Sequence, residues 1–263
     1  HRRLAIIDLS PAGAQPMTTR DGRYVLTYNG EIYNFNEIRA DLQARGYRFN
    51  SRSDSEVLLY AFAHWGLAAL SRFNGMFAFA IWDNELQKLT LARDRFGVKP
   101  LYYTQIGDLF LFGSEVKAFR GHSAYSTKLD LAGLQEYLTF QNFFTDRTLF
   151  QDVKMLPQGC TLEVKMGSGA TPTPVSFWDY DFQEPEGKYD ERAAVDELDH
   201  LFRQAVQRQL ISDVDVGSYL SGGMDSGSIT ALAARELPFM RTFTVGFDLS
   251  SASGVELGYD ERA

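Results

Sequence analysis

The order of hydrophobic and polar positions divides the chain into two parts with different architectures. In the first part, residues 37–46 and 53–65 carry apolar side chains at helical spacing, and short aromatic-rich runs follow them. Turn-forming Asn, Asp and Gly residues separate these runs, which predicts an antiparallel sheet. The expected strands are residues 76–83, 87–94, 100–106 and 109–115. The first of them is apolar almost throughout, so we expect it to lie between two packed layers.

Residues 23–34 contain a strong turn signal. The β-rich run YVLTY is followed by Asn29-Gly30 and then by EIYN. Because Asn-Gly is typical of two-residue hairpin loops, we expect a hairpin or a sharp strand junction at this pair. Asn36 is then expected to cap the first helix, and Gly46 is expected to end it.

A change of composition marks a domain boundary. A weaker strand pair around residues 160–164 precedes the Gly-, Ser-, Thr- and Pro-rich stretch 165–176, which we expect to be a hairpin loop. Residues 181–190, DFQEPEGKYD, are polar and acidic, and they are the best candidate for a linker. We therefore predict a first domain at residues 1–182 and a second domain at residues 190–263.

The second part has the pattern of a parallel strand–helix–strand unit. Residues 190–211 have apolar positions at helical spacing, so we expect one long amphipathic helix. A strand (213–220), a glycine-rich loop, a helix (229–237) and a strand (242–247) follow it. Strands joined through a helix pair in parallel, which indicates the start of an α/β domain after an α+β domain.

Composition and charge exclude several classes of partner. The 263 residues include 26 basic and 34 acidic side chains, and the formal charge of -8 opposes binding to nucleic acid or to a membrane surface. No stretch approaches the roughly 20 apolar residues that span a bilayer, and no secretory signal is recognisable, so we expect a cytoplasmic protein. A single cysteine, Cys160, excludes an internal disulfide framework. Both ends look cut, because the chain begins with His1 and stops without a closing element.

The loop before the second-part helix has the composition of a phosphate-binding turn. Its residues are Ser221, Gly222, Gly223, Met224, Asp225 and Ser226. Adjacent glycines permit close approach of a ligand to the backbone, and the N-terminus of a helix offers free N–H groups and partial positive charge. The lysine of a Walker loop is missing, and Asp225 is placed to orient Mg²⁺. The alternative is a plain helix start that Ser226 or Asp225 caps.

This loop resembles the pyrophosphate loop of the ATP pyrophosphatases, a family that adenylates a substrate and releases pyrophosphate. The resemblance implies ATP and Mg²⁺ as cofactors. The residues that it implies for binding the polyphosphate and its Mg²⁺ are Ser221, Gly222, Gly223, Asp225 and Ser226. Leu220 and Val245, at the ends of the two parallel strands, would then lie beside the adenine and ribose, where open α/β sheets bind ligands.

Several motifs of the first part belong together. They are Arg3 in HRRLAIIDLS, Asn29-Gly30-Glu31 in YNGEIYN, Asp54 in SRSDSEV, and the runs GMFAFAIWD and LARDRFGVKPLYY. Together they resemble class II glutamine amidotransferases, and the asparagine synthetase family in particular, over nearly the whole chain. The resemblance implies a glutaminase domain of the N-terminal-nucleophile type with α/β/β/α layers, followed by the start of a parallel-sheet ATP-pyrophosphatase domain.

The resemblance also implies a role for individual residues of the first part. Arg3 would bind the carboxylate of glutamine, and Asp54 its ammonium group. The Asn29 side chain and the Gly30 N–H would form an oxyanion hole, and Glu31 would contribute to ammonium binding. Each feature has a structural alternative: the Asn-Gly pair as a plain hairpin turn, Arg3 as a surface cation and Asp54 as a helix cap.

The nucleophile that the resemblance implies is an N-terminal cysteine whose free α-amine acts as the general base. We expect the segment that carries it to precede His1. Cys160 and the four histidines are expected to have no catalytic role, since free cysteine behaves mostly as a small hydrophobic residue. Arg93-Asp94-Arg95 is expected to be structural, because charges at a strand end are mostly solvated or paired.

The implied reaction is glutamine-dependent asparagine synthesis. Ammonia from glutamine would reach the second domain, where ATP activates aspartate as an adenylate, and asparagine, glutamate, AMP and pyrophosphate would result. Glutamine, aspartate and ATP are the expected partners. Whether the protein forms a homodimer is left open, and the fragment alone is expected to be inactive. One alternative is a related amidotransferase, or a lactam- or lasso-forming synthetase, with another acceptor carboxylate. Another is a nonenzymatic ATP-binding regulatory protein.

Overall fold

The computed structural model describes residues 1–167, 172–183 and 190–246. The chain divides into two compact units, His1–Phe182 and Gln183–Ala263. The expected hairpin loop at 165–176 and the expected linker at 181–190 lie partly outside the described residues, at positions 168–171 and 184–189.

An antiparallel sheet forms the centre of the first unit. Within the described residues its strand order is β1-β2-β3-β4-β8-β9. The bounds are Met17–Thr18 (β1), Tyr24–Ile32 (β2), Gly75–Asp83 (β3), Lys88–Arg93 (β4), Cys160–Lys165 (β8) and Val175–Ser176 (β9). The strands β2 and β3 pair along their whole length, from Tyr24 opposite Asp83 to Ile32 opposite Gly75. This pair therefore sets the register of the sheet.

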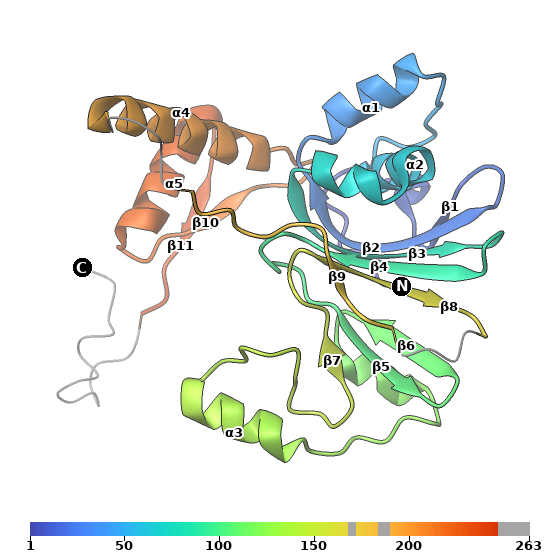
Figure 1. Ribbon diagram of the computed structural model, residues 1–263. Helices are drawn as coiled ribbons and strands as arrows, with labels where there is room; N and C mark the ends of the chain where they lie inside the picture. The colour runs from blue at the N-terminus through green and yellow to red at the C-terminus, as the bar shows by residue number, and fades with distance from the viewer. Residues whose placement is uncertain (168–171, 184–189, 247–263) are drawn as a thin grey trace. The chain divides into compact units, whose positions relative to one another are not determined.

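Two helices, α1 (Phe35–Ala44) and α2 (Asp54–Trp65), cover one face of this sheet (Figure 1). Alternate side chains of β2 and β3, such as Leu26 and Phe79, point into the core beneath the helices. The ring of Phe62 on α2 meets the ring of Phe79 edge-on, with centroids 6.3 Å apart. Both helices were predicted from the spacing of their apolar residues, and both predictions are confirmed.

A second sheet covers the other face, and within the described residues its order is β6-β5-β7. The bounds are Tyr102–Ile106 (β5), Leu109–Gly113 (β6) and Lys154–Met155 (β7). Ala78 and Ala80 of β3 pack in a second core with Leu101 and Tyr103. The strand β3 is therefore buried on both faces, as its apolar run predicts. The runs around residues 100–115 belong to this second sheet and do not extend the first.

The helix α3 (Leu131–Phe140) lies on the far side of the second sheet from α1 and α2 (Figure 1), and Gly133 is its only buried residue. The mixed α+β architecture with antiparallel sheets is as expected, whereas the outer helical layer of the predicted α/β/β/α order stays a prediction. Three short 3₁₀ helices complete the described part of this unit. They are η1 (Pro11–Gly13), η2 (Gly66–Arg72) and η3 (Val116–Gly121).

The predicted turn at Asn29-Gly30 is wrong. Both residues lie inside β2, opposite Ala78 and Phe77 of β3. A Cβ at Gly30 would lie 2.7 Å from the Phe77 Cα and would also collide with the carbonyl oxygen of Met76. The glycine therefore permits the close approach of two paired strands, and the long-range pairing overrides the local turn signal.

The predicted cap of the first helix is also wrong. The cap position is Asn34, not Asn36, and its side chain makes no capping hydrogen bond. Instead, the Asn34 Nδ2 donates to the carbonyl oxygen of Arg72, and its Oδ1 accepts from the N–H of Asn74, both at 2.9 Å. The side chain thus ties the start of the helix to the segment that leads into β3.

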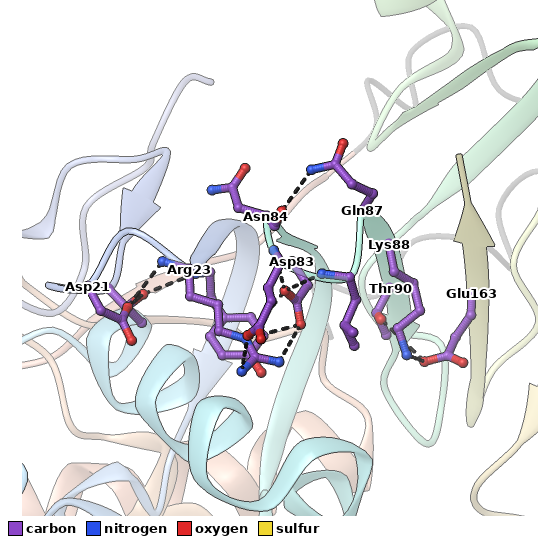
Figure 2. Close-up of polar contacts among 12 residues, drawn as sticks. Asp21, Arg23, Asp83, Asn84, Gln87, Lys88, Thr90 and Glu163 are labelled. Carbon is purple, nitrogen blue, oxygen red and sulfur yellow. Dashed lines mark hydrogen bonds and ion pairs between the residues drawn. The ribbon is translucent and has the colours of Figure 1, made fainter. Parts of the chain in front are cut away.

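Charged side chains secure the end of the sheet where β3 turns into β4 (Figure 2). Asp83 accepts hydrogen bonds from the Arg23 guanidinium, with Nη2 3.0 Å from Oδ2, and from two backbone N–H groups of the turn. On the neighbouring strands, the Lys88 ammonium lies 2.6 Å from the Glu163 carboxylate. These contacts link the residue before β2 to β3, and β4 to β8.

One buried carboxylate organises the loop after β4. Asp94 accepts hydrogen bonds of 3.0–3.2 Å from the backbone N–H groups of Phe77, Phe96, Val98 and Lys99. The neighbouring Arg93 donates to the carbonyl oxygens of Gly97, Lys99 and Leu156. Both side chains are buried and engaged with the backbone, so they have the structural role that was expected of them.

The second unit contains a parallel strand pair joined by a helix. Its described elements are α4 (Glu191–Gln209), β10 (Gly217–Tyr219), α5 (Met224–Glu236) and β11 (Arg241–Phe243). The strands β10 and β11 pair in parallel, which confirms the predicted βαβ crossover. Across the described ranges of both units, no helix combines the length and the apolar character that crossing a membrane requires.

The Asp94 carboxylate generates a stability prediction. Replacement by alanine leaves four backbone N–H groups without their acceptor, so Asp94→Ala should lower the free energy of unfolding by about 3 kcal/mol. Denaturant unfolding followed by circular dichroism measures this change. The control is Asp108→Ala on an exposed turn, which should stay within about 0.5 kcal/mol of the wild type. Equal stabilities of the two variants would contradict the organising role of Asp94.

Candidate functional site

A cavity of about 550 Å³ opens beside β2 in the first unit. Its lining includes the residues that the sequence singled out in this part of the chain, which are Arg3, Asn29, Gly30, Glu31 and Asp54. The structure therefore brings together residues from the N-terminal segment, from β2 and from the start of α2.

The strand β2 presents an open edge to this cavity, because β1 pairs only with its first part. Further along, side chains take the place of a strand: the Tyr28 N–H donates to the Gln15 Oε1 at 2.5 Å, and the Ile32 N–H donates to the Asp54 Oδ2 at 3.0 Å. Alternate residues of a strand direct their N–H groups to the same side. The Gly30 N–H, which lies between these two, therefore points to the open edge.

The side chain of Asn29 lies where the two sheets meet. Its Nδ2 donates to the Ser114 Oγ at 3.4 Å, and Ser114 directly follows β6 of the second sheet. An amide nitrogen carries two hydrogens, so a second donor remains for a ligand. The cavity thus has two neighbouring donor positions, at the Asn29 amide and at the Gly30 backbone.

Asp54 is buried at the start of α2. Its Oδ2 accepts hydrogen bonds from the Tyr28 hydroxyl at 2.8 Å and from the Ile32 N–H at 3.0 Å. The helix cap is Ser53, which accepts from the Ser55 N–H, so the alternative in which Asp54 is the cap is wrong. Burial raises the pKa of Asp54, although the bonds from Ile32 and Tyr28 favour its ionised form.

A second carboxyl group, Glu31, lies close to Asp54 in the same cavity. Burial raises the pKa of Glu31 to about 7, the charge of Asp54 acts in the same direction, and Lys99 opposes both. The charge of Asp54 thus opposes the ionisation of Glu31, and a positive charge bound beside both carboxyl groups would offset this repulsion.

Arg3 is half-buried and held by its surroundings. Its Nη2 donates to the carbonyl oxygen of Ile7 at 2.6 Å and lies 3.5 Å from the Ser53 Oγ. The guanidinium rests over Gly13, where a Cβ would come within 2.6 Å of Nη1. These contacts distinguish Arg3 from a freely solvated surface cation and fix its charge at the cavity.

The sequence did not identify several residues of this lining. Gln15, Lys99 and Ser114 belong to it, and so does His1, whose Nε2 lies 3.2 Å from the carbonyl oxygen of Tyr28. Lys99 follows the buried Asp94 in the run RDRFGVKP, and Ser114 stands in the run FGSE. The sequence shows the runs that contain Lys99 and Ser114, but it does not show that these residues reach the cavity, because their position depends on how the second sheet packs.

Cys160 lies in β8 and lines a different cavity, of about 380 Å³. Burial raises the pKa of its thiol, and the charge of Asp179 acts in the same direction. Both effects disfavour the thiolate, which is the reactive form.

In the second unit, the glycine-rich loop joins β10 to α5. Gly222 has a φ of 82°, a conformation that favours glycine, and Gly223 is the cap residue of α5 without a side-chain cap. The Ser226 hydroxyl bonds to the Ser221 Oγ at 3.0 Å and to the Gly223 carbonyl oxygen at 3.2 Å. Neither Ser226 nor Asp225 caps the helix, so that alternative is wrong.

Leu220 and Val245 follow the carboxyl ends of β10 and β11. The Leu220 N–H donates to the Phe243 carbonyl oxygen at 2.9 Å, and the Thr244 Oγ1 donates to the Leu220 carbonyl oxygen at 2.7 Å. Val245 and Asp225 are exposed. The parallel pair therefore places both strand ends and the loop at one edge of the unit.

Two protein families match this chain. The family described as glutamine amidotransferase domain matches residues 1–178, and the family described as asparagine synthase matches residues 197–263. These matches confirm the resemblance that the motifs indicated.

Three relatives show how far the similarity extends. Asparagine synthetase (glutamine-hydrolyzing) 3 of Bacillus subtilis (strain 168) is 40% identical over 238 residues, which cover 89% of this chain and 38% of that protein. Asparagine synthetase (glutamine-hydrolyzing) 1 of the same organism is 38% identical over 262 residues, covering 100% of this chain and 40% of that protein. Amidase chry2 of Gibberella zeae is 32% identical over 282 residues, which cover 100% of this chain and 40% of that protein.

The chain spans about 40% of the length of these relatives. Because the amidotransferase match covers residues 1–178 of 263, the chain belongs to the glutamine amidotransferase domain family, and the asparagine synthase family matches the part that follows.

Proposed function

We propose that the complete protein is a glutamine-dependent asparagine synthetase, and that the cavity at the open edge of β2 binds glutamine. The observation that carries the proposal is the convergence of the sequence-selected residues on one cavity. They supply a guanidinium, two carboxyl groups and two N–H donors, which match the carboxylate, ammonium and amide groups of glutamine. The family match of residues 1–178 supports the same assignment.

The two ends of glutamine are recognised by opposite charges. Arg3 binds the α-carboxylate, because a guanidinium pairs well with a carboxylate and this one is already held in place. The α-ammonium binds beside Glu31 and Asp54, where it relieves the repulsion between the two carboxyl groups. This orientation directs the side-chain amide toward Asn29 and Gly30.

The amide is hydrolysed through a tetrahedral intermediate whose oxygen carries negative charge. The Gly30 N–H and the Asn29 Nδ2 stabilise this oxyanion, since both donors are fixed before the reaction begins. The family resemblance supplies an N-terminal cysteine as the nucleophile. Cys160 does not take this role, because it lines another cavity and burial raises the pKa of its thiol.

In the second unit, ATP binds at the loop between β10 and α5. The uncapped start of α5, together with Ser221, Gly222 and Gly223, offers N–H groups and hydroxyls to the phosphates. Adenine and ribose lie beside Leu220 and Val245. The acceptor carboxylate attacks the α-phosphate of ATP, pyrophosphate leaves, and an acyl adenylate forms. Ammonia then attacks the acyl carbon and displaces AMP, which gives the amide.

Asp225 is the proposed Mg²⁺ ligand. The described residues contain no group of three or more His, Cys, Asp or Glu side chains that could hold a metal ion. Mg²⁺ commonly uses one or two carboxylates, several waters and the phosphates of the substrate. A single exposed carboxylate in the first turn of α5 fits that mode, in which the ion arrives with ATP.

Aspartate is the proposed acceptor, and another acceptor carboxylate is the second candidate. The similarity to Amidase chry2, which extends over the whole chain, favours keeping that candidate. The substrate dependence of pyrophosphate release separates the two. Release that requires aspartate supports the asparagine synthetase, release that requires another acid supports the second candidate, and no release would refute both.

The experiment that tests the proposal compares two nitrogen sources in the full-length protein. With ATP, Mg²⁺ and aspartate, the wild type should form asparagine from either glutamine or ammonium. Asn29→Ala should lower the glutamine-dependent rate by about 10²- to 10³-fold, because one oxyanion donor is lost, and should keep the ammonium-dependent rate. Quantifying asparagine by amino-acid analysis measures both rates.

The matched control is Asn36→Ala, which removes an exposed asparagine from α1 outside the cavity. It should retain both rates. An Asn29→Ala variant that uses glutamine as well as the wild type, or that loses both rates equally, would contradict the proposed site.

The raised pKa of Glu31 generates a pH prediction. Glu31 ionises as the pH rises through about 7, and only its ionised form attracts the α-ammonium group. Glutamate, the product of hydrolysis, should therefore bind more tightly at about pH 8 than at about pH 6. Isothermal titration calorimetry measures the dissociation constant at each pH, and Glu31→Gln should remove most of the dependence. The same pH dependence in Glu31→Gln would show that another group is responsible.

A further inference from the structure

We propose that Ser114 is a positioning residue for the oxyanion hole, because it holds the amide group of Asn29 in the orientation that directs an N–H donor into the cavity. This inference rests on the proposed glutaminase function and deepens it. It adds a residue that directly follows β6 of the second sheet to a site whose two oxyanion donors come from β2.

The contact joins the two sheets at the cavity. The Asn29 Nδ2 and the Ser114 Oγ lie 3.4 Å apart, and both residues are half-buried and line the cavity. The bond is longer than the usual 2.9–3.0 Å of N–H···O contacts. Contacts of catalytic groups are often long without substrate and tighten in the complex. Because a contact of 3.4 Å adds little to the stability of the fold, we assign Ser114 a role in orienting the Asn29 amide.

Orientation matters because the terminal torsion of an asparagine side chain is soft and roughly two-fold. A half-turn about this torsion exchanges the Nδ2 donor for the Oδ1 acceptor. An acceptor facing the developing oxyanion would repel it, whereas the second hydrogen of Nδ2 would stabilise it. In the structure the Ser114 Oγ accepts from Nδ2, and this contact restrains the amide in the productive orientation before the substrate arrives.

Ser114 is itself well placed for this task. The residue before it, Gly113, pairs with Tyr102 of β5, and η3 begins two residues after it. The buried ring of Phe119 anchors η3 near the end of β6, since a Cβ at Gly113 would lie 3.5 Å from this ring. The serine thus sits between a paired strand and an anchored helix, which limits its movement.

The test is a double-mutant cycle in the full-length protein, with glutamine hydrolysis followed by glutamate release. Ser114→Ala should lower kcat by about 3- to 10-fold, the range expected for loss of one hydrogen bond, and should leave KM for glutamine nearly unchanged. Ser114→Thr keeps the hydroxyl and should retain most of kcat. In an Asn29→Ala background, Ser114→Ala should cause no further loss, because the two residues act as a pair.

The control is Ser71→Ala, which removes an exposed hydroxyl that donates to the Ala68 carbonyl oxygen at 3.0 Å outside the cavity. It should keep the kcat of the wild type. A wild-type kcat in Ser114→Ala, or an equal loss with and without Asn29, would overturn this inference alone. A wild type that does not hydrolyse glutamine would overturn the proposed function and this inference with it.

Discussion

The candidate site depends on the pairing of β2 with β3. This pairing fixes the register from Tyr24–Asp83 to Ile32–Gly75. It directs the backbone N–H groups of alternate residues to the open edge and leaves the Asn29 side chain on the face of the second sheet. A slip of one residue would exchange these directions. The close approach of the two strands at Gly30 is thus a condition for the cavity as well as for the core.

Two buried aspartates connect the fold to the site in similar ways. Asp54 ties the start of α2 to the open edge of β2 through Ile32 and Tyr28. Asp94 gathers the loop that ends at Lys99. A buried charge is costly unless hydrogen bonds satisfy it, and here the donors are mainly backbone N–H groups of the segments that line the cavity. The same bonds that permit burial therefore position the charged lining.

The sequence predicted the elements whose pattern is local. The apolar run of β3 indicated burial on both faces, and the helices α2 and α4 followed from periodicity. The pair Asn29-Gly30 led to a wrong prediction of a turn, because the pairing of β2 with β3 outweighs the local turn propensity of these two residues. Membership of β5 and β6 in a second sheet was not predictable, since it depends on packing between distant segments.

The residues of the cavity also divide into those that local sequence motifs identify and those that only the tertiary structure reveals. Arg3, Asn29, Glu31 and Asp54 were identified from motifs and their resemblance to a family, and the fold brings them together. Ser114 was missed, as were Gln15 and Lys99, because each reaches the cavity only through tertiary structure. Their side chains carry no local signal that distinguishes them from ordinary polar residues.

The most direct test of this account is a crystal structure of the full-length protein with glutamate bound. The account predicts the α-carboxylate at Arg3, the α-ammonium beside Glu31 and Asp54, and the side-chain carboxyl within hydrogen-bond distance of Asn29 and the Gly30 N–H. Glutamate bound elsewhere, or bound in this cavity with its α-carboxylate turned toward Asn29, would contradict it.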